Sequence, residues 1–155
     1  MTDDISSGYV YRRTFLSLTA AGALSVIARP AKAAESISFG QLYSKFGVLG
    51  LEYSDKVKAL AGKPVSMEGF MAPPLKAEAN FFVLTEIPMA LCPFCSSDAD
   101  WPDNIVVIYL GGKQTFLPGG TRILVDGKLE LGSWTDPETG FLSRLRIRDA
   151  SFREA

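Results

Sequence analysis

Hydrophobic and polar residues follow a two-residue period over much of the chain after residue 64, which predicts strands. Five segments carry this signal: "VSMEGFM" (65–71), "FFVLTEI" (81–87), "IVVIYL" (105–110), "RILVDGKLELG" (122–132) and "FLSRLRIRDASF" (141–152). The segment 105–110 is apolar on both faces, so we expect it to be a central strand covered on both sides. Glycine, proline and aspartate pairs such as Gly111-Gly112 and Asp136-Pro137 mark turns between the segments.

An earlier stretch changes to a helical period. In "LEYSDKVKALAG", Leu51, Val57 and Leu60 recur at roughly helical spacing, and Gly62 is a plausible helix stop. The pattern predicts a helix over 54–61, within an N-terminal helical segment, 34–64, that precedes a β-domain at 65–155.

Two of the predicted strands resemble each other. "VSMEGFM" and "ILVDGKL" share an acidic residue followed by a glycine, Gly69 in one and Gly127 in the other. A glycine midway along a strand indicates a bulge or bend, which lets one strand serve two sides of a small barrel. Five strands of which the first and fourth are bent in this way are typical of the OB-fold, a five-stranded Greek-key barrel. We therefore predict an all-β fold with a small α contribution: an OB-fold-like barrel preceded by a helix and a cleavable signal peptide.

The first 33 residues have the organisation of an export leader. Two arginines precede an apolar run, and the segment ends on Ala31-Lys32-Ala33, a small-x-small cleavage signal. The run is shorter than the ~20 residues that span a bilayer, so we expect no permanent membrane span.

The string "RRTFL" resembles the twin-arginine export signal. The matching residues are Arg12, Arg13, Phe15 and Leu16, whereas Tyr11 and Ser17 depart from the pattern. This resemblance implies that the twin-arginine machinery exports the folded protein to a bacterial periplasm, an oxidising compartment.

Charge and composition narrow the function classes. The chain carries a net charge of −1 and contains no histidine. A serine-histidine-aspartate triad is therefore impossible, and the commonest metal ligand is missing. We predict a non-enzymatic protein. The slightly acidic balance is a poor match for a nucleic-acid binder.

One row of cations could contradict that last expectation. Arg144, Arg146 and Arg148 alternate with apolar residues and should share one face of a strand. Such a row could bind single-stranded nucleic acid, or it could pair across strands with Asp126, Glu130 or Glu138. The acidic balance favours pairing.

Both cysteines lie in "CPFC", as Cys92 and Cys95. An oxidising compartment favours a disulfide that stiffens the loop. A thiol-disulfide redox centre is an alternative, although the turn-forming residues that follow differ from the helix that activates thioredoxin-like thiols. The third alternative is a zinc or copper ion held by both thiolates with Asp98 or Met89.

The same segment is the predicted binding loop, with Phe94, Asp100 and Trp101 expected at its surface. The strings "GKxVxxxGFM" and the cysteine segment before "IVVIYL" resemble an uncharacterised family of exported bacterial proteins with a domain of unknown function. This resemblance implies a periplasmic OB-like domain that works beside transport machinery, and it brings no catalytic residues. We expect a binding protein for a small ligand, a metal ion or a periplasmic or transporter partner, with a thiol redox protein as the alternative and a single-stranded nucleic-acid binder as a weaker one.

Overall fold

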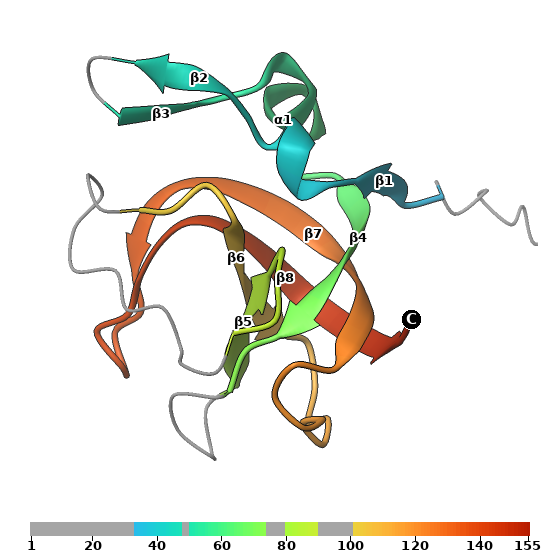
Figure 1. The fold of residues 1–155 in the computed structure, drawn as a ribbon. Coiled ribbons are helices and arrows are strands. Elements are labelled where there is room, and N and C mark those ends of the chain that lie inside the picture. Colours follow the sequence, from blue (N-terminus) through green and yellow to red (C-terminus); the bar gives the residue numbers. More distant parts are fainter. Residues whose placement is uncertain (1–32, 48–49, 74–79, 90–100) are drawn as a thin grey trace, which may run out of the picture. The chain divides into compact units, whose positions relative to one another are not determined.

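The computed structural model describes residues 33–47, 50–73, 80–89 and 101–155 (Figure 1). Contacts between residues divide the chain into two units, Met1–Pro30 and Ala31–Ala155. All the described residues belong to the second unit. Within the described residues the fold is mostly β with one short α-helix, which confirms the all-β prediction. No helix in this described part is long and apolar enough to cross a membrane.

All five predicted strands are present, and their bounds differ from the prediction by a few residues. They are β4 (Pro64–Met71), β5 (Phe81–Thr85), β6 (Ile105–Leu110), β7 (Arg122–Thr135) and β8 (Leu142–Glu154). Their hydrogen-bonded order is β4-β5-β6-β8-β7, and β7 pairs again with β4, so the pairings form a closed circuit. The β6–β8 pair is parallel and the other pairs of the circuit are antiparallel. Figure 1 shows β7 and β8 as long, strongly curved strands.

The N-terminal part holds more strand than the sequence pattern predicts. Its elements are β1 (Glu35–Ile37), the 3-10 helix η1 (Phe39–Gln41), β2 (Tyr43–Gly47), β3 (Gly50–Tyr53) and α1 (Asp55–Leu60). The strand β1 lies parallel to β4, and β2 and β3 form an antiparallel hairpin. These strands are three to five residues long, too short for alternation to be visible.

The helix α1 forms where the sequence predicts it, within one residue at each end. The hydroxyl of Ser54 accepts a hydrogen bond from the Val57 backbone N–H at 3.1 Å and so caps the first turn. Beyond the last turn, Gly62 has φ of 73°, the left-handed conformation that favours glycine after a helix.

The two bend glycines are sites of close backbone approach. A Cβ atom on Gly69 would lie 2.8 Å from the Thr85 carbonyl oxygen, and one on Gly127 would lie 2.5 Å from the Ile147 Cγ2 atom. The two similar segments pair with each other in antiparallel register, so that each glycine faces the first residue of the other copy: Gly69 faces Ile123 and Gly127 faces Val65. Glycine is needed at both bends because a side chain there would separate packed strands.

The core cluster contains buried residues from the five strands of the circuit and from the N-terminal elements β1, η1, β3 and α1. Every residue of β6 is buried, as the doubly apolar pattern predicts. Leu145 and Ile147 of β8 are fully buried and alternate with the arginines of the same strand. The arginines therefore lie on the face of β8 that points away from the core.

Candidate functional site

Arg144, Arg146 and Arg148 of β8 lie against aromatic rings. The Arg144 guanidinium carbon is 5.9 Å from the ring centroid of Tyr53, and that of Arg146 is 5.4 Å from Trp134. Arg148 lies 4.2 Å from the Trp134 centroid and 5.1 Å from that of Tyr109. These distances are in the range of cation–π contacts. We call the three arginines with Tyr53, Trp134 and Tyr109 the arginine ladder.

A single carboxylate pairs with two arginines of the ladder. Glu130 Oε2 lies 3.1 Å from Arg146 Nε and 2.9 Å from Arg148 Nε. Arg146, which is 7 % exposed, also donates to the backbone oxygen of Gly132 at 2.7 Å. The predicted cross-strand pairing is thus confirmed for Glu130, whereas Asp126 pairs with Arg153 at 2.6 Å.

At its Tyr53 end, the ladder is connected by ring stacking and hydrogen bonds to Trp101, the residue that follows the cysteine segment. The Tyr53 hydroxyl donates to the Arg144 carbonyl at 2.5 Å, and its ring stacks on Tyr43 with centroids 5.6 Å apart. Trp101 Nε1 donates to the Tyr43 hydroxyl at 2.9 Å. Burial raises the pKa of Tyr43 above its usual range, so this hydroxyl stays protonated. The expectation that Trp101 is exposed was wrong: Trp101 is 4 % exposed, because its indole packs into the core cluster and its N–H is used internally.

The other end of the ladder borders a hollow of about 230 Å³ where β5, β6, β7 and the β7–β8 loop meet. We call it the Tyr109 hollow. Its lining residues are Asn80, Phe81, Tyr109, Trp134, Asp136, Pro137, Glu138, Thr139 and Arg148. Three of them form an aromatic wall: the Phe81 and Tyr109 rings stack at 5.1 Å, and Trp134 meets Tyr109 edge-on at 5.2 Å.

Two polar groups of this hollow are buried. The Tyr109 hydroxyl lies beside Asp136 but makes no hydrogen bond of good geometry with the described residues. Burial raises the pKa of Tyr109 above its usual range, and the negative charge of Asp136 adds to the rise.

Asp136 is 8 % exposed and has a structural task in the turn. Its Oδ1 atom accepts from the backbone N–H groups of Glu138 and Thr139, both at 2.9 Å. Burial by itself would raise the pKa of Asp136, but these hydrogen bonds outweigh it and the pKa is lowered. The carboxylate therefore remains charged in the hollow.

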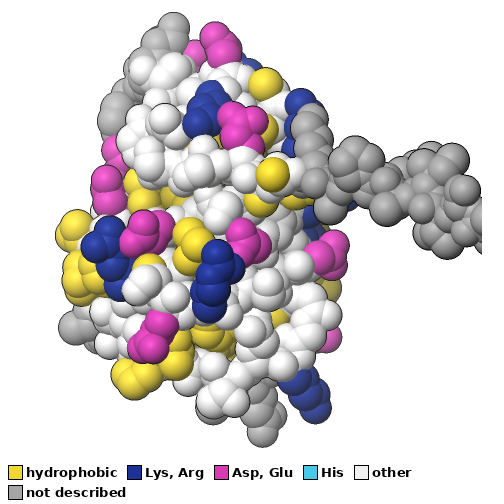
Figure 2. Space-filling model, turned by 90° about the vertical axis from the view of Figure 1, so that its right-hand side faces the viewer, with side chains coloured by type: hydrophobic (Ala, Val, Ile, Leu, Met, Phe, Trp, Pro, Cys, Tyr) yellow, Lys and Arg dark blue, Asp and Glu magenta, His cyan; other side chains and the backbone are white. Residues whose placement is uncertain are grey.

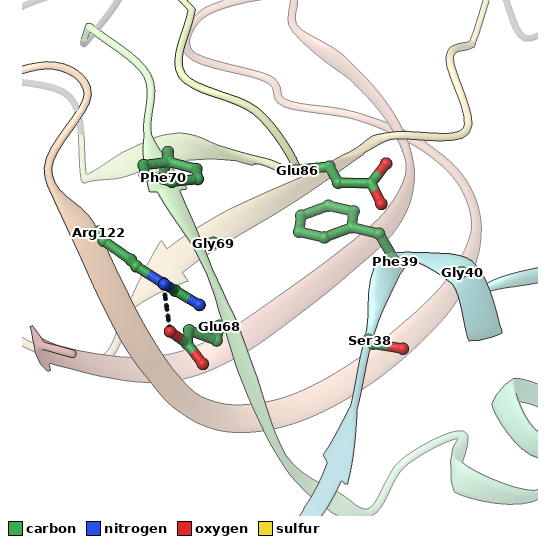
Figure 3. A pocket seen from close by; sticks show the side chains of 8 residues that line it. All are labelled: Ser38, Phe39, Gly40, Glu68, Gly69, Phe70, Glu86 and Arg122. Carbon is green, nitrogen blue, oxygen red and sulfur yellow. Dashed lines mark ion pairs between the residues drawn. The ribbon is translucent and has the colours of Figure 1, made fainter.

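A second hollow, about 300 Å³ in volume, lies over β4 and η1 (Figure 3). We call it the Glu68 hollow. Figure 3 shows Arg122 paired with Glu68, while Glu86 stands apart from that pair beside Phe39. Both partners of the ion pair are well exposed, at 64 % for the Arg122 side chain and 44 % for that of Glu68. Exposed pairs of this kind contribute little, ~0 to 1 kcal/mol.

Most of the predicted site residues lie outside the described residues. These are the cysteines Cys92 and Cys95 with Phe94, Asp98 and Asp100, and the leader residues Arg12, Arg13, Phe15, Leu16 and Ala31. The flanking Met89 is half-buried. Among the described residues, no group of three or more Cys, Asp or Glu side chains is placed to hold a metal ion.

The cysteine segment joins β5 to β6 at the end of this strand pair where Thr85 faces Ile105. There the Glu86 backbone N–H donates to the Asn104 carbonyl at 3.1 Å. Phe81 and Tyr109 face each other at the other end of the pair, where the Tyr109 hollow lies. The arginine ladder runs along the outer face of the sheet from one end of this strand pair to the other.

Three residues of the candidate site were not predicted from the sequence: Tyr109, Trp134 and Asn80. Two signals were present: Tyr109 is the one residue of "IVVIYL" with a polar group in its side chain, and Trp134 stands two residues before the Asp136-Pro137 turn. Neither signal points to a site until the strand pairing brings the residues together.

Charge on the visible face of Figure 2 is finely mixed. Basic side chains there stand next to acidic ones, which is the pattern of local ion pairs. This is not the broad basic surface that nucleic-acid binding requires.

No family model and no curated protein matches the sequence. Among solved structures, the fold is similar to that of a DUF3299 family protein from Pseudomonas aeruginosa PAO1. The TM-score is 0.50 and the identity 12 %, and the similarity covers 79 % of this chain and 98 % of the other. At this identity the similarity concerns the fold alone, and it agrees with the sequence resemblance to a family of uncharacterised function.

Proposed function

We propose that this is a non-enzymatic binding protein whose ligand occupies the Tyr109 hollow. One observation carries the proposal: the Tyr109 hydroxyl is buried in the wall of a hollow beside the Asp136 carboxylate, yet it makes no hydrogen bond of good geometry with a described residue. Unsatisfied buried polar groups cost about 1–3 kcal/mol, so they are rare where no partner is recruited.

We further propose that the barrel is an OB-fold. In chain order the pairing is first-second-third-fifth-fourth, closing on the first, with the third and fifth strands parallel. OB-folds bind ligands beside their second and third strands, with the loops that join the first strand to the second and the fourth to the fifth. Asn80 ends the first of these loops and Asp136 lies in the second, so the position of the Tyr109 hollow supports the proposal.

A blocking substitution tests the binding site. The Glu138 side chain is exposed, lines the Tyr109 hollow and makes no contact with the described residues that Glu138→Trp would remove. We expect fragments that shift the Trp134 indole N–H resonance to lose binding in this variant. Glu86→Trp is the matched control, since Glu86 is also exposed and lines the Glu68 hollow. Fragments that bind both variants alike would place the binding site elsewhere.

Export to the periplasm remains part of the proposal. It rests on the twin-arginine motif and on the proximity of the Ala31–Ala33 cleavage signal to the boundary between the two contact units. Changing Arg12 and Arg13 to lysine should leave the precursor in the cytoplasm. Fractionation that finds the variant in the periplasm would exclude this route.

The cysteine pair is proposed as a disulfide that stiffens a second contact surface for a transporter partner, and a zinc or copper ion held by both thiolates is the alternative. The redox alternative makes a different prediction, because a working redox pair exchanges with glutathione. Counting free thiols and bound zinc or copper in protein purified from the periplasm separates these states. A disulfide that never exchanges would exclude the redox function.

Nucleic acid is not a proposed ligand, because two of the three ladder arginines are paired internally with Glu130 and Arg144 donates to the Leu51 carbonyl. Binding of single strands with a steep salt dependence would contradict this.

A further inference from the structure

Two of the charges around the Tyr109 hollow are already held by groups within the protein. Arg148 lies over Trp134 and Tyr109 and is paired with Glu130, so its charge and two ring faces are occupied. Asp136 holds its negative charge with two backbone N–H groups. The rim adds the exposed carboxylate of Glu138.

The positions of these charges disfavour charged ligands of either sign. A cation entering the hollow would approach the aromatic wall where the Arg148 guanidinium already lies. An anion would face the carboxylates of Asp136 and Glu138, and it would compete with Glu130 for Arg148. Both arrangements leave like charges together in a partly desolvated place, which is unfavourable.

The free hydrogen-bonding positions in the hollow are mostly acceptors. Asn80 donates its amide N–H to the Leu110 carbonyl at 3.1 Å, and its amide oxygen accepts from no described residue. Asp136 uses its Oδ1 atom for two backbone N–H groups, so its second oxygen can accept from a ligand as well as from the neighbouring Tyr109 and Thr139 side chains. The Tyr109 hydroxyl can donate or accept. A matching ligand therefore carries several hydroxyl groups.

The volume of the hollow limits the size of its ligand. At about 230 Å³ it is below the ~300 Å³ at which sites for drug-sized molecules begin, so it has room for one small ring. The apolar faces of a sugar ring suit an aromatic wall, and OB-folds include oligosaccharide binders. We infer that the Tyr109 hollow binds one uncharged, polyhydroxylated ring, such as a single residue of a neutral glycan. This inference rests on the proposed binding function and names its ligand class.

Three sugars of similar ring and different charge test the ligand class: N-acetylglucosamine (neutral), glucosamine at mildly acidic pH (cationic) and glucuronate (anionic). Saturation-transfer NMR on the purified protein should detect the neutral sugar, with a Kd on the order of 1 mM for a ligand of this size. The two charged sugars should bind at least about tenfold more weakly.

Two variants connect that binding to the hollow. Tyr109→Phe should weaken N-acetylglucosamine binding about fivefold, because a buried hydroxyl group is lost. Asn80→Ala removes another acceptor that lines the hollow and should act similarly, which covers the case that Tyr109→Phe fails to fold. Tyr43→Phe is the matched control, since it removes a hydroxyl outside the hollow.

The outcomes separate the ligand class from the binding function. Tyr109-dependent binding of glucosamine or glucuronate in preference to the neutral sugar would overturn the ligand class and leave the binding function standing. The same holds if no sugar binds while fragments sensitive to Glu138→Trp do. If neither sugars nor fragments shift the Trp134 indole resonance, both proposals fail.

Discussion

The Tyr109 hollow and the Glu68 hollow are built from the same kinds of residue, yet they differ in how their polar groups meet water. Each combines aromatic rings, two carboxylates and one arginine in a volume of 230 to 300 Å³. At the Glu68 hollow the ion pair is about half exposed. At the ladder beside the Tyr109 hollow, the Arg146 side chain is 9 % exposed, and Asp136 in the hollow is 8 % exposed.

This difference supports the Tyr109 hollow, and not the Glu68 hollow, as the proposed ligand site. Exposed polar groups have water as a partner and gain little from a ligand. Buried polar groups have lost that water, so a protein partner or a ligand must replace it. Volume and residue type alone would have ranked the two hollows as equals.

The largest expected effect is the difference in stability between variants of two carboxylates, Glu130 and Glu68. Glu130→Ala leaves the buried Arg146 and its neighbour Arg148 without their shared counter-ion, and it should lower the free energy of unfolding by about 3 kcal/mol. Glu68→Ala removes an exposed pair with Arg122 and should cost less than about 1 kcal/mol. Urea denaturation midpoints at constant m-value measure both. Equal effects would remove the distinction between the two surfaces.

The five strands β4 to β8 could be predicted from the sequence because their signal is local. Alternation around Gly69 and Gly127 and the apolar run of β6 do not depend on distant residues. The hairpin β2–β3 gave no such signal, because its position depends on single long-range contacts such as the Tyr53 hydroxyl on the Arg144 carbonyl.

The candidate site was missed for the same reason. Asn80, Tyr109 and Asp136 are far apart in sequence and meet only through strand pairing. The arginine row was predicted, since three alternating cations are visible in one segment, but its aromatic partners come from β3, β6 and β7.

The next largest effect is expected from alanine substitutions at the two bend glycines, Gly127 and Gly69. In Gly127→Ala the new methyl group would meet the Ile147 methyl at 2.5 Å and two backbone atoms of β8 at 2.8 and 3.0 Å. We expect a loss of roughly 2–3 kcal/mol, the range of overpacked cores, and a displaced ladder, because Arg148 supplies one of those backbone atoms. Gly69→Ala meets one backbone oxygen and two side-chain atoms, which can move more easily, so its loss should be smaller.

Gly112→Ala is the control for both, because a methyl group on Gly112 would have no neighbouring atom within 4 Å among the described residues. Thermal or urea denaturation of the three variants ranks them. A larger loss at Gly69 than at Gly127 would show that the β4 bend, and with it the surface of the Glu68 hollow, is the more rigid of the two.

The smallest expected effect is the pH dependence of the stability that the Asp136 carboxylate contributes. Folding lowers the pKa of Asp136 below its ordinary value of 3.8, so the charged carboxylate stabilises the fold. That contribution is complete above the ordinary value and is lost as the pH falls through the lower pKa of the folded state. Asp136→Asn should therefore be less stable than the wild type at neutral pH by about 1 kcal/mol. The difference should shrink in strong acid, where the wild-type carboxylate is protonated.

Asp149→Asn is the matched control, since Asp149 is exposed and has φ of 50°, a conformation that asparagine also adopts readily. It makes the same change of side chain outside the Tyr109 hollow. Urea midpoints at neutral and strongly acidic pH measure both variants. If the deficit of Asp136→Asn persists unchanged in acid, the shape of the amide and not the lost charge is responsible. The Asp136 carboxylate would then no longer distinguish the Tyr109 hollow from the solvated carboxylates of the Glu68 hollow.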